Sequence, residues 1–217
     1  MSTAAPLTWD DIQSRIWDCD HCATNPTVAY CIRQRTGRAT VPVRLLLIGV
    51  APPHVRGVTV RTAADSATND PSDNLRRFVE RSLGSSWDSL VERGLFLIHG
   101  VKCAIVPKDH HQNPKRRVVD ACAPRHFALE LEHLRPERIL ALGGSPFRAL
   151  RMVPGLELPP GLGLSTSVGD LISRAAGGVD GRTANWRFKL HISPFPSTDP
   201  SNAERILREA AAMVGLL

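Results

Sequence analysis

The sequence has no long apolar segment. No apolar run approaches the ~18 residues that a membrane-spanning helix needs. Asp10 and Asp11 interrupt the amino-terminal segment before the apolar core of a signal peptide could form. We therefore expect a cytoplasmic protein with no membrane partner.

The chain also lacks internal repeats, low-complexity tracts and a complete nucleotide-binding loop. The first two absences exclude repeat architectures and long compositionally biased tracts. Gly143-Gly144-Ser145-Pro146 could present backbone amides to an anion at the start of a helix, although the two glycines suit a tight turn equally well. Because the full GxGxxG or GKS pattern is missing, we expect no nucleotide cofactor.

Cysteine is scarce and odd in number, with five residues. In a cytosolic chain such cysteines are poor disulfide candidates. The chain does not need cross-links, because a single domain of 217 residues can bury roughly 70% of its unfolded surface. We expect one domain over residues 1–217, and a monomer.

Acidic residues are outnumbered by basic ones. The chain has 21 Asp plus Glu against 27 Lys plus Arg, a net charge of +6 and a pI of about 9.5. This balance indicates a polyanionic partner. Residues 108–117 concentrate basic side chains, including Lys115, Arg116 and Arg117, which could neutralise phosphates and release counterions. A solvated loop is the alternative for a run of charge alone.

Short apolar runs alternate with helical patterns along the chain. The runs typical of buried parallel strands cover residues 43–49, 95–98, 138–143 and 188–191. Helical periodicity covers residues 75–83, 119–134, 145–152 and 202–215. The alternation predicts an α/β fold with a parallel sheet covered on both faces.

Two stretches lie outside this alternation. A capping box at Thr8 and Asp11 predicts a helix that runs into Cys19, so residues 1–40 should form an amino-terminal helix and a cysteine-bearing loop. Residues 153–186 are rich in Gly and Pro, and we expect them to form an irregular insertion.

An unusual turn follows each predicted strand. These turns cover residues 50–54, 99–103, 143–146 and 191–194. In an open α/β sheet the ligand crevice lies outside the carboxyl ends of the strands, so the four turns should converge on one cleft. His191 and Ser193 on the last turn could orient a phosphate or polarise a leaving group, although a histidine at a strand end is often only structural.

Four of the cysteines suit a metal site. Cys19 and Cys22 form a CxxC motif, and Cys103 and Cys122 follow far downstream. Two thiolates from one turn and two from distant loops could complete a four-ligand site. The alternatives are buried small apolar residues or a redox pair, but a redox CxxC would sit between a strand and a helix, and this one follows a helix. Cys31 is the spare cysteine, although it could also take part.

The order of these motifs resembles the uracil-DNA glycosylase superfamily, particularly its iron–sulfur branch, families 4 and 5. The resemblance covers about residues 19–196. It rests on LIGVAPP at 47–53, VKC at 101–103, Pro107, NP at 113–114, AC at 121–122, RP at 135–136, ALG at 141–143 and HISP at 191–194.

The resemblance implies a three-layer α/β/α sandwich with a central four-stranded parallel sheet. It also implies a [4Fe–4S] cluster on Cys19, Cys22, Cys103 and Cys122, with zinc as the alternative metal. The implied function is base excision from DNA, in which the N-glycosidic bond of a flipped deaminated or damaged base is hydrolysed.

The resemblance also implies roles for the residues that follow the strands. Gly49, Val50, Ala51 and Pro52 would belong to the base pocket. His191 would support the departing base, Ser193 and Pro194 would hold the DNA backbone, and Phe195 would be an apolar wedge in the base stack.

The sequence departs from the family pattern at two functional positions. Val50 stands where family 4 has its water-activating glutamate, although family 5 is also apolar there. His99 stands where the family usually has an asparagine that reads uracil. His54 and His99 are therefore our candidates to position water or to read the base. A catalytically silent iron–sulfur protein that binds damaged or single-stranded DNA is the alternative function, and a zinc-stabilised domain unrelated to repair is a third.

Overall fold

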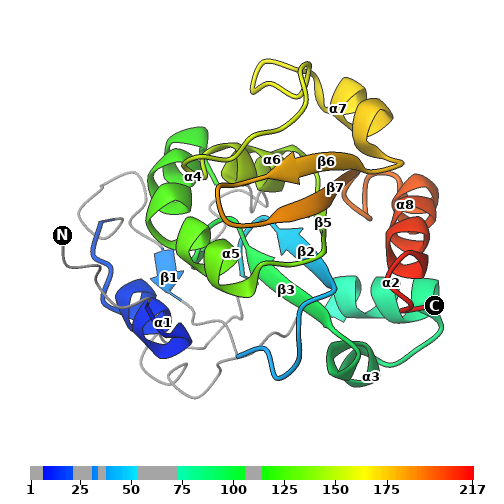
Figure 1. The fold of residues 1–217 in the computed structure, drawn as a ribbon, viewed down its shortest axis with the longest axis horizontal. Coiled ribbons are helices and arrows are strands. Elements are labelled where there is room, and N and C mark those ends of the chain that lie inside the picture. Colours follow the sequence, from blue (N-terminus) through cyan, green and yellow to red (C-terminus); the bar gives the residue numbers. More distant parts are fainter. Residues whose placement is uncertain (1–6, 22–30, 34–37, 53–72, 106–113) are drawn as a thin grey trace.

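A five-stranded sheet forms the centre of the computed structural model, which describes residues 7–21, 31–33, 38–52, 73–105 and 114–217 (Figure 1). The strand order is β3 (Leu95–His99), β2 (Leu45–Gly49), β5 (Arg138–Leu142), β7 (Arg187–Ser193) and β6 (Val179–Arg182). The first four are parallel and correspond to the four predicted apolar runs, whereas β6 pairs with β7 antiparallel. The prediction of a four-stranded sheet therefore missed an edge strand.

Alternate residues of each strand face two separate cores. Leu46 and Ile48 of β2 contribute to one core, and Leu45 and Leu47 contribute to the other. All five residues of β2 are buried, because both faces of the sheet are covered by helices. The layered α/β/α arrangement predicted from the sequence is confirmed.

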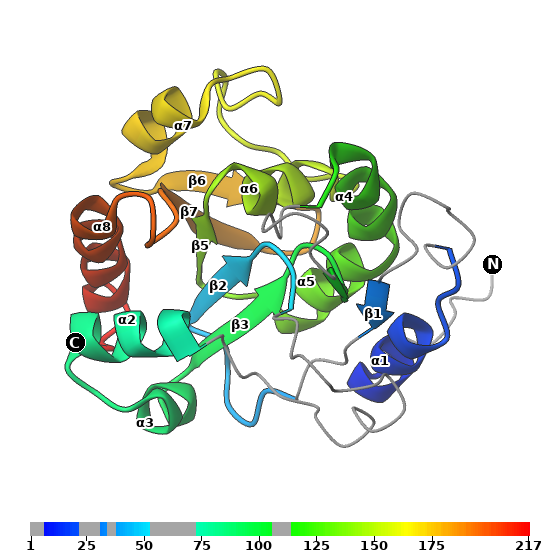
Figure 2. The same ribbon diagram turned by 180° about the vertical axis from the view of Figure 1, so that it is seen from behind.

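The helices divide between the two faces of the sheet (Figures 1 and 2). The first core is covered by α1 (Trp9–Trp17), α4 (Arg116–Cys122), the π-helix η2 (Ala123–Phe127), α5 (Ala128–Leu134) and α6 (Gly144–Arg151). The second core is covered by α2 (Asp73–Leu83), α3 (Trp87–Glu92) and α8 (Pro200–Ala212). In the part of the chain that the structure describes, no helix is long and apolar enough to cross a membrane.

The helix predicted over residues 119–134 begins earlier and contains a widened turn. It starts at Arg116, and its middle is the π-helical turn Ala123–Phe127. Pro124 lies in this turn, where it has no N–H to donate and its ring would collide with the carbonyl four residues earlier in a regular helix. A π turn accommodates the proline without ending the helix.

The amino-terminal helix follows the predicted capping box. The Thr8 hydroxyl accepts a hydrogen bond from the Asp11 backbone N–H, and the Asp11 carboxylate accepts one from the Thr8 backbone N–H at 2.9 Å. The reciprocal pair satisfies two backbone donors at the helix start. The buried face of α1 carries Trp9, Ile12 and Ile16. Packing of this face fixes the direction in which the helix leads to Cys19.

Residues 153–186 are more regular than the sequence predicts. They contain the helix α7 (Val168–Ala175) and the edge strand β6, so the prediction of an irregular insertion is wrong for these two parts. In addition, β1 (Cys31–Arg33) pairs antiparallel with β4 (Cys103–Ile105), a small sheet that the sequence did not predict.

Candidate functional site

One large cavity, with a volume of about 750 Å³, lies at the carboxyl ends of the parallel strands. Residues at or just past the ends of all four strands line it, as the order of the turns predicts. They are Gly49 at the end of β2 with Val50, Ala51 and Pro52 after it, His99 at the end of β3, Gly143–Phe147 after β5, and Pro194 and Phe195 after β7. The cavity is thus the crevice expected for an open α/β sheet.

His99 forms the polar end of the β3 wall. It is paired in register with Gly49 of β2, and a Cβ atom on Gly49 would lie only 2.8 Å from His99 Cδ2. A glycine at position 49 therefore leaves room for the imidazole. Burial, aided by the nearby Lys102 cation, lowers the pKa of His99 to about 3. His99 is consequently neutral near pH 7 and carries one N–H donor and one nitrogen acceptor.

The turn after β5 joins two strand ends and starts a helix at the cavity. Gly143 adopts a φ of +99°, which favours glycine, and its N–H donates to the Ser193 carbonyl at 2.9 Å. Gly143 is the N-cap of α6, and its neighbours Gly144 and Ser145 line the cavity. This arrangement brings the positive end of a helix dipole to the cavity wall.

Two arginines lie at the same wall, and one of them is paired with a carboxylate. Arg116 from the start of α4 and Arg148 from α6 both line the cavity. The Arg148 guanidinium donates to both carboxylate oxygens of Asp120 at 2.6 Å, and this pairing raises the pKa of Arg148. Lys115 and Arg117 flank Arg116 and are exposed. The predicted basic segment therefore reaches the cavity through Arg116.

None of the described residues that line the cavity is an aspartate or a glutamate. Val50 and Ala51, which follow β2, leave an apolar surface where a carboxylate could have activated water. The neighbouring carboxylate of Asp120 is engaged by Arg148. The predicted candidate His54 lies outside the described residues.

His191 does not lie where the sequence predicts it. It is inside β7, fully buried, and does not line the cavity, so the prediction that it sits in a turn facing the crevice is wrong. Its Nε2 lies 3.0 Å from an Arg138 guanidinium nitrogen and its Nδ1 lies 3.0 Å from the Ala176 carbonyl oxygen. Because arginine can only donate, Nε2 must accept and Nδ1–H must donate to Ala176.

The reason for this displacement is the length of β7. The strand continues to Ser193, so the position at the strand end belongs to Ser193 and the turn begins at Pro194. The Ser193 hydroxyl is buried and donates to the Pro194 carbonyl at 3.0 Å. Pro194 and Phe195 line the cavity as expected, and Phe195 is 39% exposed.

The α7 segment supplies cavity residues that the sequence analysis missed. These are Leu164, Thr166, Val168, Leu171 and Ile172. A signal was present, because Ser167 and Asp170 have the spacing of a helix start and Val168, Leu171 and Ile172 follow at helical spacing. In the structure the Ser167 hydroxyl accepts from the Asp170 N–H at 3.1 Å and caps α7.

A second, much smaller cavity of about 10 Å³ is lined by Cys19, Cys103 and Cys122. The Lys102 backbone N–H donates to Cys122 Sγ at 3.4 Å. Cys22 lies outside the described residues, and Cys31 is described only as a strand position opposite Ile105. Among the described side chains no group of three or more potential ligands is arranged to hold a single metal ion.

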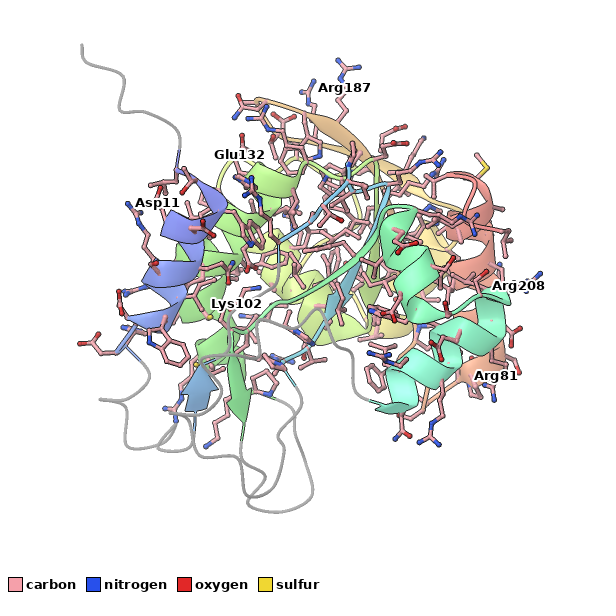
Figure 3. The ribbon with its side chains drawn as sticks, turned by 90° about the horizontal axis from the view of Figure 1, so that it is seen from below. Asp11, Arg81, Lys102, Glu132, Arg187 and Arg208 are labelled. Carbon is pink, nitrogen blue, oxygen red and sulfur yellow. The ribbon has the colours of Figure 1, made fainter. Side chains whose placement is uncertain are left out.

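A buried ion pair adjoins the cysteine cavity. The Lys102 ammonium pairs with the Glu130 carboxylate, and both side chains are almost fully buried. The other Glu130 oxygen accepts from the Gln13 side-chain amide at 2.8 Å. In Figure 3 Lys102 lies inside the molecule beside α1, whereas Asp11 lies at the outer surface of that helix. The three residues tie α1 to α5 and to the segment that carries Cys103.

Comparison with models of protein families shows to which family this chain belongs. The model of the Uracil DNA glycosylase superfamily matches residues 37–213. The chain belongs to the uracil DNA glycosylase superfamily. This membership indicates a glycosylase-like protein that acts on DNA, and the α/β/α fold is that of the superfamily. No curated protein matches the sequence. The superfamily match includes the whole cavity as well as Cys103 and Cys122, whereas Cys19 and Cys22 precede it.

Proposed function

We propose that this protein is a DNA base-excision glycosylase that hydrolyses the N-glycosidic bond of a flipped deaminated or damaged base. The observation that carries the proposal is the cavity of about 750 Å³ at the strand ends, with neutral His99 at its β3 wall and Arg116 and Arg148 beside it. A base must leave the DNA stack to reach an enclosed site, and a concave, partly apolar site next to cations suits a flipped nucleotide.

His99 is the residue proposed to read the base. Its neutral imidazole can donate one hydrogen bond and accept one, whereas an asparagine side chain offers both its groups on one planar amide. The imidazole therefore reads a base edge differently from the amide of the family pattern. We accordingly propose a base preference that differs from strict uracil recognition.

The proposed chemistry relies on charge stabilisation around the departing base. Water attacks the sugar C1′, the N-glycosidic electron pair leaves with the base, and the proton of the attacking water finally resides on that base. The α6 N-terminus and the Arg116 guanidinium, which both lie at the cavity wall, would stabilise the negative charge that develops on the base. A positioned general base contributes about 10²–10⁴-fold, so an enzyme without one should be slow but measurable.

A catalytically silent DNA-binding protein is the second candidate. Two observations favour it. No carboxylate is found among the described cavity-lining residues, and His191 is bonded to Arg138 and Ala176 in the interior rather than facing the base. Such a protein would bind the flipped or unpaired base without breaking its glycosidic bond.

Single-turnover incubation separates these two functions. Duplexes that carry uracil, hypoxanthine, xanthine or an alkylated base are mixed with excess protein, and the abasic product is detected by strand cleavage. Release of any base above the protein-free rate supports the glycosylase. Binding of the same duplexes without release of any base would replace it with the silent binder.

We further propose that Cys19, Cys22, Cys103 and Cys122 hold a [4Fe–4S] cluster, with zinc as the alternative. The support is that the three described cysteines line one cavity although they come from three distant parts of the chain. A cluster binds each thiolate through a different iron, so its ligands stand farther apart than the ligands of one zinc ion. When bound, the cluster would hold together the segments that carry these cysteines.

A further inference from the structure

Half of the exposed large apolar side chains in the described part of the chain line the large cavity. The set comprises Val41, Leu164, Val168, Phe195, Met213 and Leu217. Of these, Leu164, Val168 and Phe195 all line the large cavity, with exposed fractions of 44%, 45% and 39%. Single exposed apolar residues need no explanation, but apolar residues that gather at one cavity mark a binding surface.

The exposure of Val168 is not a consequence of loose packing. Leu171 and Ala175, one and two turns farther along α7, are buried in the core at 3% and 0% exposure. Ser167 caps the helix, and the Ala176 carbonyl at its end is held by the His191 imidazole. Val168 also packs so closely on the start of α6 that a Cβ on Gly144 would lie 2.8 Å from Val168 Cγ2. A fixed helix thus presents an apolar side chain to the cavity rim.

The same rim joins apolar and cationic groups. Arg116 and Arg148 line the cavity that Leu164, Val168 and Phe195 border. Cations suit DNA phosphates, whereas exposed apolar side chains suit the faces of bases that have lost their stacking partners. Paired and stacked duplex DNA hides these faces, and opened or single-stranded DNA exposes them.

We propose that Leu164 and Val168 form, together with Phe195, an apolar rim that packs against unstacked bases and selects locally opened DNA over fully paired duplex. Phe195 supplies one part of the rim from the turn after β7, and α7 with its preceding loop supplies the other. The inference rests on the proposed function, because it requires that DNA enters this cavity.

The test compares binding to two short duplexes of the same length, one fully paired and one with a block of central mismatches. Fluorescence anisotropy of labelled DNA gives both dissociation constants for the wild type and for the variant Leu164→Ser/Val168→Ser. We expect the wild type to prefer opened DNA, and the variant to lose about tenfold of that affinity while binding paired DNA as before. The thermal unfolding midpoint should fall only slightly, because Leu164 and Val168 are already 44% and 45% exposed.

Two controls make the result specific to the rim. Met213→Ser removes an apolar side chain that is 65% exposed and does not line the cavity, and it should leave both affinities unchanged. Leu164→Met/Val168→Ile keeps the rim apolar and should retain the preference for opened DNA. Loss of the preference in the serine variant alone supports the inference.

The test distinguishes a failure of the rim assignment from a failure of the proposed function. If the wild type binds paired and opened DNA equally, or if the serine variant keeps the full preference, the rim assignment is wrong while the proposed glycosylase function stands. If the wild type binds neither DNA, the proposed function itself is overturned, and the rim assignment with it.

Discussion

His191 shows how one hydrogen-bonding environment determines the role of a residue. Its imidazole is neutral, with Nε2 accepting from Arg138 and Nδ1–H donating to Ala176 at the end of α7. A Cβ on Gly178 would lie 2.7 Å from His191 Cε1, so the loop after α7 packs directly on the ring. The residue expected to support a departing base instead holds the α7 segment against β7.

His99 and His191, whose pKa values are both lowered in the folded state, predict a loss of stability in acid. Burial, with the Arg138 charge as a smaller cause, lowers the pKa of His191, and burial lowers that of His99 to about 3. The folded state therefore resists protonation below the unfolded pKa of about 6.5, and stability falls as pH falls below that value, by up to about 1.4 kcal/mol per pH unit for each proton. Urea unfolding at pH 7.5 and 5.5 measures the change.

Replacement of either histidine should reduce this pH dependence. His191→Gln and His99→Asn each remove one group that titrates in the unfolded chain but resists protonation in the folded one. An unchanged pH dependence in both variants would contradict the assignment. His191→Ala is expected to lower the unfolding free energy, because it removes the contacts of the imidazole with Arg138 and with the Ala176 carbonyl at the end of α7.

The Lys102–Glu130 pair predicts strong non-additivity. Glu130→Ala leaves the Lys102 ammonium buried without its carboxylate and should cost about 3–5 kcal/mol of unfolding free energy. Lys102→Met/Glu130→Leu removes both charges and should cost less than Glu130→Ala alone. Denaturant unfolding of the single and double variants measures the difference. Equal or additive losses would show that the pair is not desolvated in the way the structure indicates.

The proposed ligand assignment predicts which cysteine-to-serine replacements lose metal. Serine at position 19, 22, 103 or 122 should lower both the iron content and the yield of soluble protein, because a cluster on these cysteines would tie distant segments of the chain together. Cys31→Ser should do neither. Iron analysis and absorbance in the iron–sulfur charge-transfer region provide the measurements. Metal loss in Cys31→Ser with retention in Cys122→Ser would reverse the ligand assignment.

At the scale of elements, the first turn of α4 contains residues that destabilise a helix start. Its N-cap is Lys115, which makes no side-chain cap bond, and its first turn has no acidic residue but carries Arg116 and Arg117. Cations at a helix N-terminus oppose the helix dipole. A site that interacts with phosphates gives a reason for this arrangement, because Arg116 lines the cavity.

This conflict predicts opposite effects on stability and binding. Lys115→Asp supplies a cap and an acidic group, so it should raise the unfolding free energy by about 1 kcal/mol. The same change should weaken DNA binding for every sequence. Neutralising Lys115, Arg116 and Arg117 together should flatten the dependence of affinity on salt, by about 0.9 in slope for each lost phosphate contact. An unchanged slope would show that this segment is only solvated.

At the scale of the whole molecule, catalysis depends on a cavity that four strand ends, α6 and α7 build together. With no carboxylate among its described lining residues, we expect slow excision of a deaminated base under single-turnover conditions. His99→Asn should shift the preference toward uracil, because an amide then replaces the imidazole at the base edge. The ratio of excision rates on uracil and hypoxanthine duplexes tests this. A ratio that does not change would remove His99 from base reading.

The sequence by itself determined the layered fold and the location of the site. Residues 45–49 and 139–142 are apolar along their whole length, which only a sheet covered on both faces accommodates, and the turns at their ends must then share one crevice. Local signals also determined the start of α1, because both partners of its capping box lie within one helical turn.

Only the tertiary structure decided which side chains face the cavity. His191 and Ser193 are buried within β7, whereas Pro194 follows the strand and lines the cavity. The pairing of β7 with β5 determines where the strand ends. The α7 wall and the Gln13–Glu130–Lys102 contact depend on segments far apart in the chain, with a sequence separation of 117 between Gln13 and Glu130. Apolar periodicity reports burial along one segment, but it carries no information about which distant segment covers it, so these contacts exist only once the sheet has assembled.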